Sequence, residues 1–160
     1  MASKGQMTGM RGVYLVAAEL SKLGFIVSPT SRSAAGADLL VTDQACRKAW
    51  SVQVKTNGKP VNFWLVGENA LKLTSESHAY VFVNINGEKR PEYVVASSMH
   101  VATKTVAYAS KKDSAKPTIW WSFYRKDRPA EGEGWELFGD PNPVEDVVAE
   151  QELTADQAEA

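Results

Sequence analysis

The chain has few of the residues that mark secreted, membrane or disulfide-rich proteins. Of its 160 residues only Cys46 is a cysteine, which excludes a disulfide scaffold. No stretch reaches the roughly 20 consecutive apolar residues of a membrane span, and the opening MASKGQMTGMRG lacks the apolar block of a secretory signal. We therefore expect a cytoplasmic protein, with Cys46 reduced and no membrane partner.

The common catalytic motifs are missing as well. The sequence contains no GxxxxGK[ST] phosphate loop, no GxSxG elbow, no GxGxxG turn and no CxxC or HExxH metal motif. Its two histidines, His78 and His100, lie in different predicted elements, and we interpret each as structural. Cys46 lies in a predicted turn with no histidine near it in sequence, so we do not expect it to be a nucleophile.

Charge is low overall but unevenly distributed. The formal net charge is −1, yet residues 141–160 hold six acids and no lysine or arginine. Without that tail, 18 basic residues face 13 acidic ones, and within residues 1–59 eight basic residues face three acids. The near-neutral total therefore conceals a basic front segment, which either faces a polyanion or is an ordinary solvated surface.

What is present predicts one α/β domain over residues 1–140. Apolar residues at helical spacing predict a helix over 11–23, ended by Gly24. Short strands follow at 24–30, 37–43 and 49–56, the last two joined by a polar turn as an antiparallel pair. The acidic residues 141–160 are expected to be disordered; they either keep the protein soluble or fold back on the basic body and compete with nucleic acid.

The second half of the domain is predicted from similar patterns. Residues 63–66 are expected to extend the sheet, with a helical turn over 68–73. HAYVFVNIN (78–86) is typical of a strand buried on both faces. A strand over 92–97 then leads into a helix capped by Ser97 and reaching about Ser110. Two further segments complete the prediction: a helical pattern through Ile119, Trp120, Phe123 and Tyr124, and a closing GWELFGDP.

Polar residues on two of these strands form a candidate site. Asp38 begins one strand, and Gln53 and Lys55 end the next. Alternation along a strand puts Gln53 and Lys55 on one face, with Trp50, Val52 and Val54 facing the core. A carboxylate, an amide oxygen and an ammonium that converge there can hold a divalent cation and activate a water next to a phosphodiester. Taken singly, Asp38 is also a plausible strand-edge turn residue and Lys55 a solvent-facing charge.

In this form the sequence resembles the PD-(D/E)XK nuclease superfamily. The matching residues are Gly36-Ala37-Asp38 on one strand and Gln53-Val54-Lys55 on the next, preceded by the helix GVYLVAAELSKLGF. The resemblance implies a restriction-endonuclease-like fold, a mixed β-sheet flanked by helices in the order αβββαβ. It also implies that Asp38 and Gln53 bind Mg²⁺ or Mn²⁺ and that Lys55 orients or activates water. The glutamine variant is similar to that of Mrr-like and Holliday-junction-resolvase-like proteins.

Two positions depart from the pattern of active relatives. Gln53 is neutral where a carboxylate is usual, which removes a negative charge from the metal site. Relatives often carry a glutamate after the glycine corresponding to Gly12, but this chain has Val13. Glu19, two turns further along, is a possible metal ligand, although an ion pair with Lys22 is the simpler interpretation.

Further residues are candidates for binding nucleic acid. Donors suited to phosphate oxygens lie in the loop before Asp38 and after Lys55; they are Ser31, Arg32, Ser33, Thr56 and Lys59. The aromatic residues Trp120, Trp121, Phe123, Tyr124, Trp135 and Phe138 either stack on bases or, as their spacing favours, cover the core.

The sequence thus predicts a metal-dependent endonuclease that hydrolyses DNA phosphodiesters, with RNA as another possible substrate and a homodimer as a possible assembly. The alternative is a catalytically silent protein of the same fold that serves as a nucleic-acid-binding or protein-interaction module. Gln53 and Val13 are the features that favour the alternative.

Overall fold

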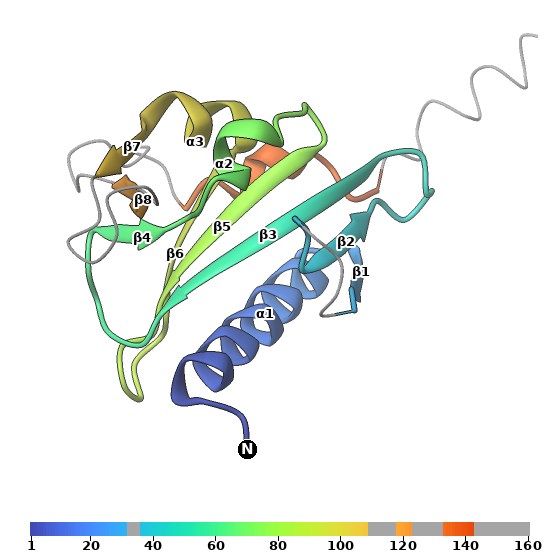
Figure 1. The fold of residues 1–160 in the computed structure, drawn as a ribbon. Coiled ribbons are helices and arrows are strands. Elements are labelled where there is room, and N and C mark those ends of the chain that lie inside the picture. The colour runs from blue at the N-terminus through green and yellow to red at the C-terminus, as the bar shows by residue number, and fades with distance from the viewer. Residues whose placement is uncertain (32–35, 109–117, 123–132, 143–160) are drawn as a thin grey trace, which may run out of the picture.

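A long N-terminal helix lies against one face of a mixed sheet (Figure 1). The computed structural model describes residues 1–31, 36–108, 118–122 and 133–142; at 106–108 and 120–122 it describes the backbone alone. Helix α1 (Lys4–Lys22) begins seven residues before the predicted start, because Ser3 and Gln6 form a reciprocal capping box. The helix ends at Leu23, next to Gly24, whose φ of 102° suits glycine.

The main sheet has five strands in the order β1-β2-β3-β5-β6. Its strands are β1 (Ile26–Pro29), β2 (Leu39–Thr42), β3 (Ala49–Asn57), β5 (His78–Asn84) and β6 (Glu92–Ser97). The predicted antiparallel pairing of β2 with β3 is confirmed, and β3 pairs with β5 in parallel. All seven residues of β5 are buried, as predicted for a central strand. The mixed α/β architecture, with helices flanking the sheet, is therefore as expected from the sequence.

Each face of this sheet carries a separate hydrophobic core. On the first face, Val16 and Leu20 of α1 pack against Val52 and Val54 of β3. The short 3₁₀ helix η2 (Trp135–Phe138) closes the same core with the fully buried ring of Phe138. Each fully buried aliphatic side chain in such a core contributes about 1.5–3 kcal/mol. This core fixes β3 and, with it, the polar residues that alternate along the same strand.

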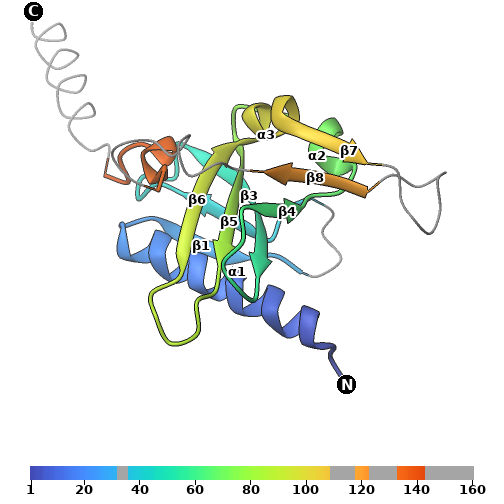
Figure 2. The same cartoon turned by 90° about the vertical axis from the view of Figure 1, so that its left-hand side faces the viewer.

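The second face is covered over only half of its width. Figure 2 shows α2 (Asn69–Lys72), α3 (Ser98–Lys104) and a second sheet of three strands over β5 and β6. The strand order of that second sheet is β4 (Phe63–Leu65), β8 (Thr118–Ser122), β7 (Thr105–Tyr108). Over β1 and β2 no helix or strand of the described residues covers this face, and Ile26 and Leu40 are 46% and 53% exposed there.

Three sequence predictions about this half were wrong. Strand β4 does not extend the main sheet but pairs with β8. The helix after Ser97 ends at Lys104, and Thr105–Tyr108 form β7. The segment predicted as helical through Ile119 and Trp120 is strand β8, because β-branched and aromatic residues favour a strand once a partner is available. The predicted helical turn at 68–73 is confirmed as α2.

Several predictions fall partly or wholly outside the described residues. These are the disorder of the tail, described only as far as residue 142, and the places of Phe123 and Tyr124. Cys46 lies exposed in the turn between β2 and β3, with a φ of 54°. Within the described part of the chain, no helix is long and apolar enough to cross a membrane.

Candidate active site at the β2–β3 edge

Asp38 directly precedes β2, at the end of the pairing between β2 and β3. Its backbone is held on both sides: its N–H donates to the Val52 carbonyl at 2.8 Å, and its carbonyl accepts from the Thr30 N–H at 2.9 Å. Thr30 Oγ1 also donates to the Ala37 carbonyl at 2.6 Å. The position of Asp38 is therefore fixed by the neighbouring strands rather than by the loop that precedes it.

The Asp38 carboxylate accepts a backbone hydrogen bond from β3 beyond the end of β2. Because β2 begins at Leu39, the N–H of Val54 has no backbone partner on that side, and Asp38 Oδ2 accepts it at 2.8 Å. The same oxygen accepts a hydrogen bond from Gln53 Nε2. The structure thus brings Asp38 and Gln53 into direct contact, as the antiparallel pairing predicted.

Lys55 lies two residues further along the same face of β3. It is half-buried, and the parallel register sets it beside Phe82, which is fully buried. Burial lowers the pKa of the Lys55 ammonium, and the nearby charge of Asp38 partly opposes that shift by raising the pKa. A lysine whose pKa is lowered in this way gives up its proton more readily than an exposed lysine does.

A pocket of about 410 Å³ opens beside Asp38 and Gln53, hereafter the Asp38 pocket. The end of β1 and the residues after it, including Thr30 and Ser31, form one wall. Helix α1 forms the other with uncharged residues, which are Gln6, Gly9, Met10, Val13 and Tyr14. Val13, at the position where the resemblance leads us to expect a glutamate in an active nuclease, therefore lines the same pocket as Asp38.

Glu19 belongs to a different part of the surface. It is not among the residues that line the Asp38 pocket, and its carboxylate lies 3.9 Å from Arg90 Nη2. Arg90 in turn forms a bidentate ion pair with Glu133 at 2.6 and 3.0 Å. Glu19 thus pairs with an arginine far along the chain and not with Lys22, and the structure does not bring it to Asp38.

The predicted nucleic-acid contacts are dispersed. Ser31 lines the Asp38 pocket, and Lys59 is exposed after the end of β3. Thr56 points toward α1, where Gly12 approaches so closely that an added Cβ would lie 1.8 Å from Thr56 Oγ1. Thr56 Oγ1 is buried there, with no hydrogen-bond partner among the described residues. Arg32 and Ser33 lie outside the described residues.

Asp38 and Gln53 have oxygen donors suited to a hard divalent cation. Within the described residues, hydrogen bonds engage Asp38 Oδ2 and Gln53 Nε2, which leaves Asp38 Oδ1 and Gln53 Oε1 as oxygen donors on adjacent side chains. No group of three His, Cys, Asp or Glu residues that could hold a metal occurs in the described part of the chain. Mg²⁺ needs few protein ligands, because waters and substrate phosphates complete its shell. The residues fit such a cation through one carboxylate and one amide.

His78, interpreted from the sequence as structural, begins β5 and lies on the same face of the sheet as Gln53, beside Ser51; the sequence did not predict its contact with Ser51. Its Nδ1 lies 2.8 Å from Ser51 Oγ and 3.1 Å from the Ser51 carbonyl oxygen. Burial lowers the pKa of His78, and the hydrogen bond to the Ser51 backbone opposes that shift. Ser51 and His78 are 27 residues apart, and only the parallel register of β3 with β5 brings them together.

The chain was compared with family models, curated proteins and solved structures. No family model matches the sequence. No curated protein matches it either. Among solved structures, a bacterial homing endonuclease, I-Ssp6803I, is similar over 96% of this chain and 99% of its own, with 13% sequence identity and a TM-score of 0.49. A likeness of this degree assigns neither family nor activity to this chain.

Proposed function

We propose that this protein is a divalent-metal-dependent nuclease of the PD-(D/E)XK type that hydrolyses DNA phosphodiesters at the β2–β3 edge. The observation that carries the proposal is the contact of Asp38 with Gln53, with Lys55 on the same strand face, at an edge that opens into a pocket. Three functional groups at this spacing match the chemistry of phosphodiester hydrolysis.

Asp38 and Gln53 would hold the cation through Asp38 Oδ1 and Gln53 Oε1. When bound, Mg²⁺ or Mn²⁺ supplies positive charge that polarises a phosphoryl oxygen and makes a bound water more acidic. The backbone hydrogen bonds of Asp38 and Val54 keep the carboxylate in place before any substrate arrives. Such preorganisation lowers the cost of orienting the reacting groups.

Lys55 would act at the attacking water. Its Nζ can donate a hydrogen bond to a water or to a phosphate oxygen, and its lowered pKa makes the ammonium a stronger acid than that of an exposed lysine. The opposite wall, formed by α1, offers no carboxylate to the Asp38 pocket, so among the described residues that line it Asp38 is the one acidic side chain.

The experiment is DNA cleavage by the full chain with Mg²⁺ or Mn²⁺, on single-stranded, duplex and branched DNA. We expect cleavage by the wild type, its loss on removal of the cation, and a fall of at least about 100-fold in Asp38→Ala and in Lys55→Ala. Lys89→Ala, which removes an exposed lysine in the turn between β5 and β6 and outside the Asp38 pocket, is the matched control and should retain activity. Cleavage that survives both site substitutions would refute the assignment.

A silent nucleic-acid-binding module of the same fold is the second candidate. It is favoured by the hydrogen bond from neutral Gln53 to Asp38, which satisfies part of the carboxylate without any metal. On this alternative, the protein binds DNA with the same affinity with and without divalent cations and cleaves none of the three substrates.

A further inference from the structure

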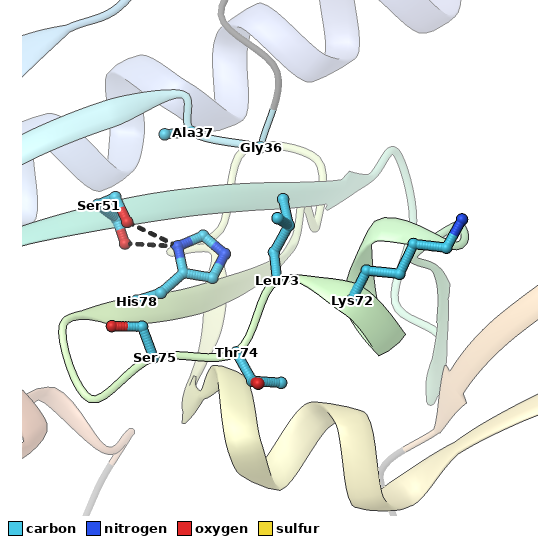
Figure 3. Close-up of a pocket in the computed structure, with 8 residues that line it drawn as sticks. All are labelled: Gly36, Ala37, Ser51, Lys72, Leu73, Thr74, Ser75 and His78. Carbon is cyan, nitrogen blue, oxygen red and sulfur yellow. Dashed lines mark hydrogen bonds between the residues drawn. The ribbon is translucent and has the colours of Figure 1, made fainter.

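A second pocket, of about 350 Å³, lies on the open face of the sheet (Figure 3). Ser51 and His78 line it from β3 and β5, and Leu73 and Thr74 line it from the segment after α2. Gly36, two residues before Asp38, closes it on the side of β2. We call it the His78 pocket. It lies at the border between the covered and the open halves of the face.

His78 presents one ring nitrogen that the fold does not use. The side chain is 6% exposed, and Nε2 is buried without a hydrogen-bond partner among the described residues. Figure 3 shows Nδ1 turned to Ser51 and the opposite edge of the ring turned toward Leu73. The ring is therefore anchored at Nδ1, and Nε2 lies buried on the side of Leu73, so a ligand reaches Nε2 when the partly exposed Leu73 side chain moves aside.

The hydrogen bonds of Nδ1 are all satisfied when this nitrogen carries the proton. A carbonyl oxygen can only accept, so the 3.1 Å contact with the Ser51 carbonyl is a hydrogen bond in that tautomer. Ser51 Oγ can then accept from Nδ1 while it donates to the Ser77 carbonyl at 3.5 Å. In that tautomer Nε2 of the neutral ring is a lone-pair acceptor, and a ligand that binds it must bring an N–H or O–H donor.

The other lining groups narrow the class of ligand. Leu73 is 41% exposed and offers an apolar surface, while Thr74 adds a hydroxyl. The described residues that line the pocket include Lys72 and no carboxylate, so an anionic strand can approach. A volume near 350 Å³ is at the small end of ligand pockets and suits one planar ring system rather than several.

We propose that the His78 pocket takes one nucleobase of a bound DNA strand, with an N–H of the base donating to His78 Nε2. This inference rests on the proposed function, because it places the base next to the reacting phosphate. Ser51 precedes Gln53 by two residues, about 7 Å along β3, so the pocket and the Asp38 edge lie within reach of neighbouring nucleotides. Every common base carries an N–H on its pairing edge, and an unpaired base can present it.

The test follows the His78 ring by NMR in the full chain, with ¹⁵N-labelled histidine and without divalent cations, so that nothing is cleaved. The probes are single-stranded DNA pentamers of each base and an abasic pentamer of equal length and charge. We expect the Nε2 resonance to shift with at least one base-bearing pentamer and to stay unchanged with the abasic one. An equal response to both, or no response of Nε2 to any pentamer, would overturn the proposal.

A pocket-filling variant checks the location without touching His78. Leu73→Trp fills the space from a partly exposed position, and Leu71→Trp is the control at a similarly exposed leucine outside the pocket. We expect Leu73→Trp to weaken pentamer binding about tenfold and Leu71→Trp to leave it unchanged. Equal affinities of the two variants would count against the pocket. A wild type that shows the Nε2 shift but cleaves no DNA would keep the pocket and refute the nuclease.

Discussion

The two faces of β3 differ in what they contact. On one face, Trp50, Val52 and Val54 are buried against α1 and η2, and the contacts are apolar. On the other face, Ser51, Gln53 and Lys55 are half-buried, and the first two form hydrogen bonds to side chains on other elements. One face of β3 thus packs in the hydrophobic core, and the other face presents polar side chains.

The two faces of β3 therefore have different roles: one stabilises the fold and the other carries the polar groups of the proposed sites. Because the apolar face fixes the backbone of β3, the polar face can hold side chains whose hydrogen-bonding groups are only partly paired, which a hydrophobic core would exclude. Damage to the α1 face should therefore reduce the free energy of unfolding. Changes on the opposite face should instead alter the binding of ligands, with smaller effects on stability.

The largest effect is expected where α1 meets β3. A Cβ at Gly12 would meet three atoms of the Thr56 side chain at 1.8–2.9 Å, so Gly12→Ala should reduce the free energy of unfolding by about 3 kcal/mol. Gly9→Ala is the control, since nothing lies within 4 Å of its added Cβ, and it should be neutral or stabilising by up to about 1 kcal/mol. Urea denaturation measures both. Equal stability of the two variants would contradict the close contact.

Gln53→Glu should lower the stability of the metal-free protein and raise its affinity for the metal ion. The hydrogen bond from the amide to Asp38 becomes a repulsion between carboxylates, and the metal-free protein should lose about 1 kcal/mol. Added Mn²⁺ should restore the loss, and its affinity should rise about tenfold over the wild type. Gln44→Glu, which removes a similar amide hydrogen bond to the Gly24 carbonyl, is the control. Its melting temperature should not recover with Mn²⁺.

Val13→Glu should add a ligand from the opposite wall. Val13 lines the Asp38 pocket, so a carboxylate there should raise the affinity for Mn²⁺ by roughly fivefold in calorimetry. Ala18→Glu introduces the same charge at an exposed position on α1 outside the pocket and should change the affinity little. Similar gains in both variants would mean that net charge alone is responsible.

The smallest expected effect is a loss of folding stability at acidic pH. Burial lowers the pKa of His78, so the unfolded chain takes up a proton near pH 6.5 that the folded chain resists. Stability should therefore be lost as the pH falls through about 6.5 toward the lower folded pKa, by a few degrees in melting temperature. His78→Gln should remove this part of the pH dependence. His100→Gln, at an exposed histidine, should retain it.

The sequence predicted the parts of the molecule that depend on local patterns. The alternation along β3, its hairpin with β2 and the contact of Asp38 with Gln53 follow from strand period and pairing alone. The second sheet was missed because β4 and β8 are separated by more than 50 residues, and their pairing turns the apolar segment at Ile119 into a strand. The His78 pocket was missed for the same reason, since it forms only when β5 lies parallel to β3.

Local patterns also do not specify distances between elements. The sequence offered Glu19 as a possible metal ligand and has Val13, on the same helix, where a glutamate was expected from the resemblance. The structure turns Val13 toward the Asp38 pocket and Glu19 toward Arg90. The orientation of α1 depends on two sets of contacts: Gly12 packs against Thr56, and Val16 and Leu20 pack in the core. The spacing of residues in the sequence does not by itself predict the partners in these contacts.

The central claim is that the polar edge of β3 holds a divalent cation through Asp38. Calorimetric titration of the full chain with Mn²⁺, in parallel with Asp38→Ala, measures this directly. The account predicts one resolved site in the wild type that disappears in Asp38→Ala while the variant remains folded by circular dichroism. No binding to the wild type, or binding that persists without the Asp38 carboxylate, would contradict it.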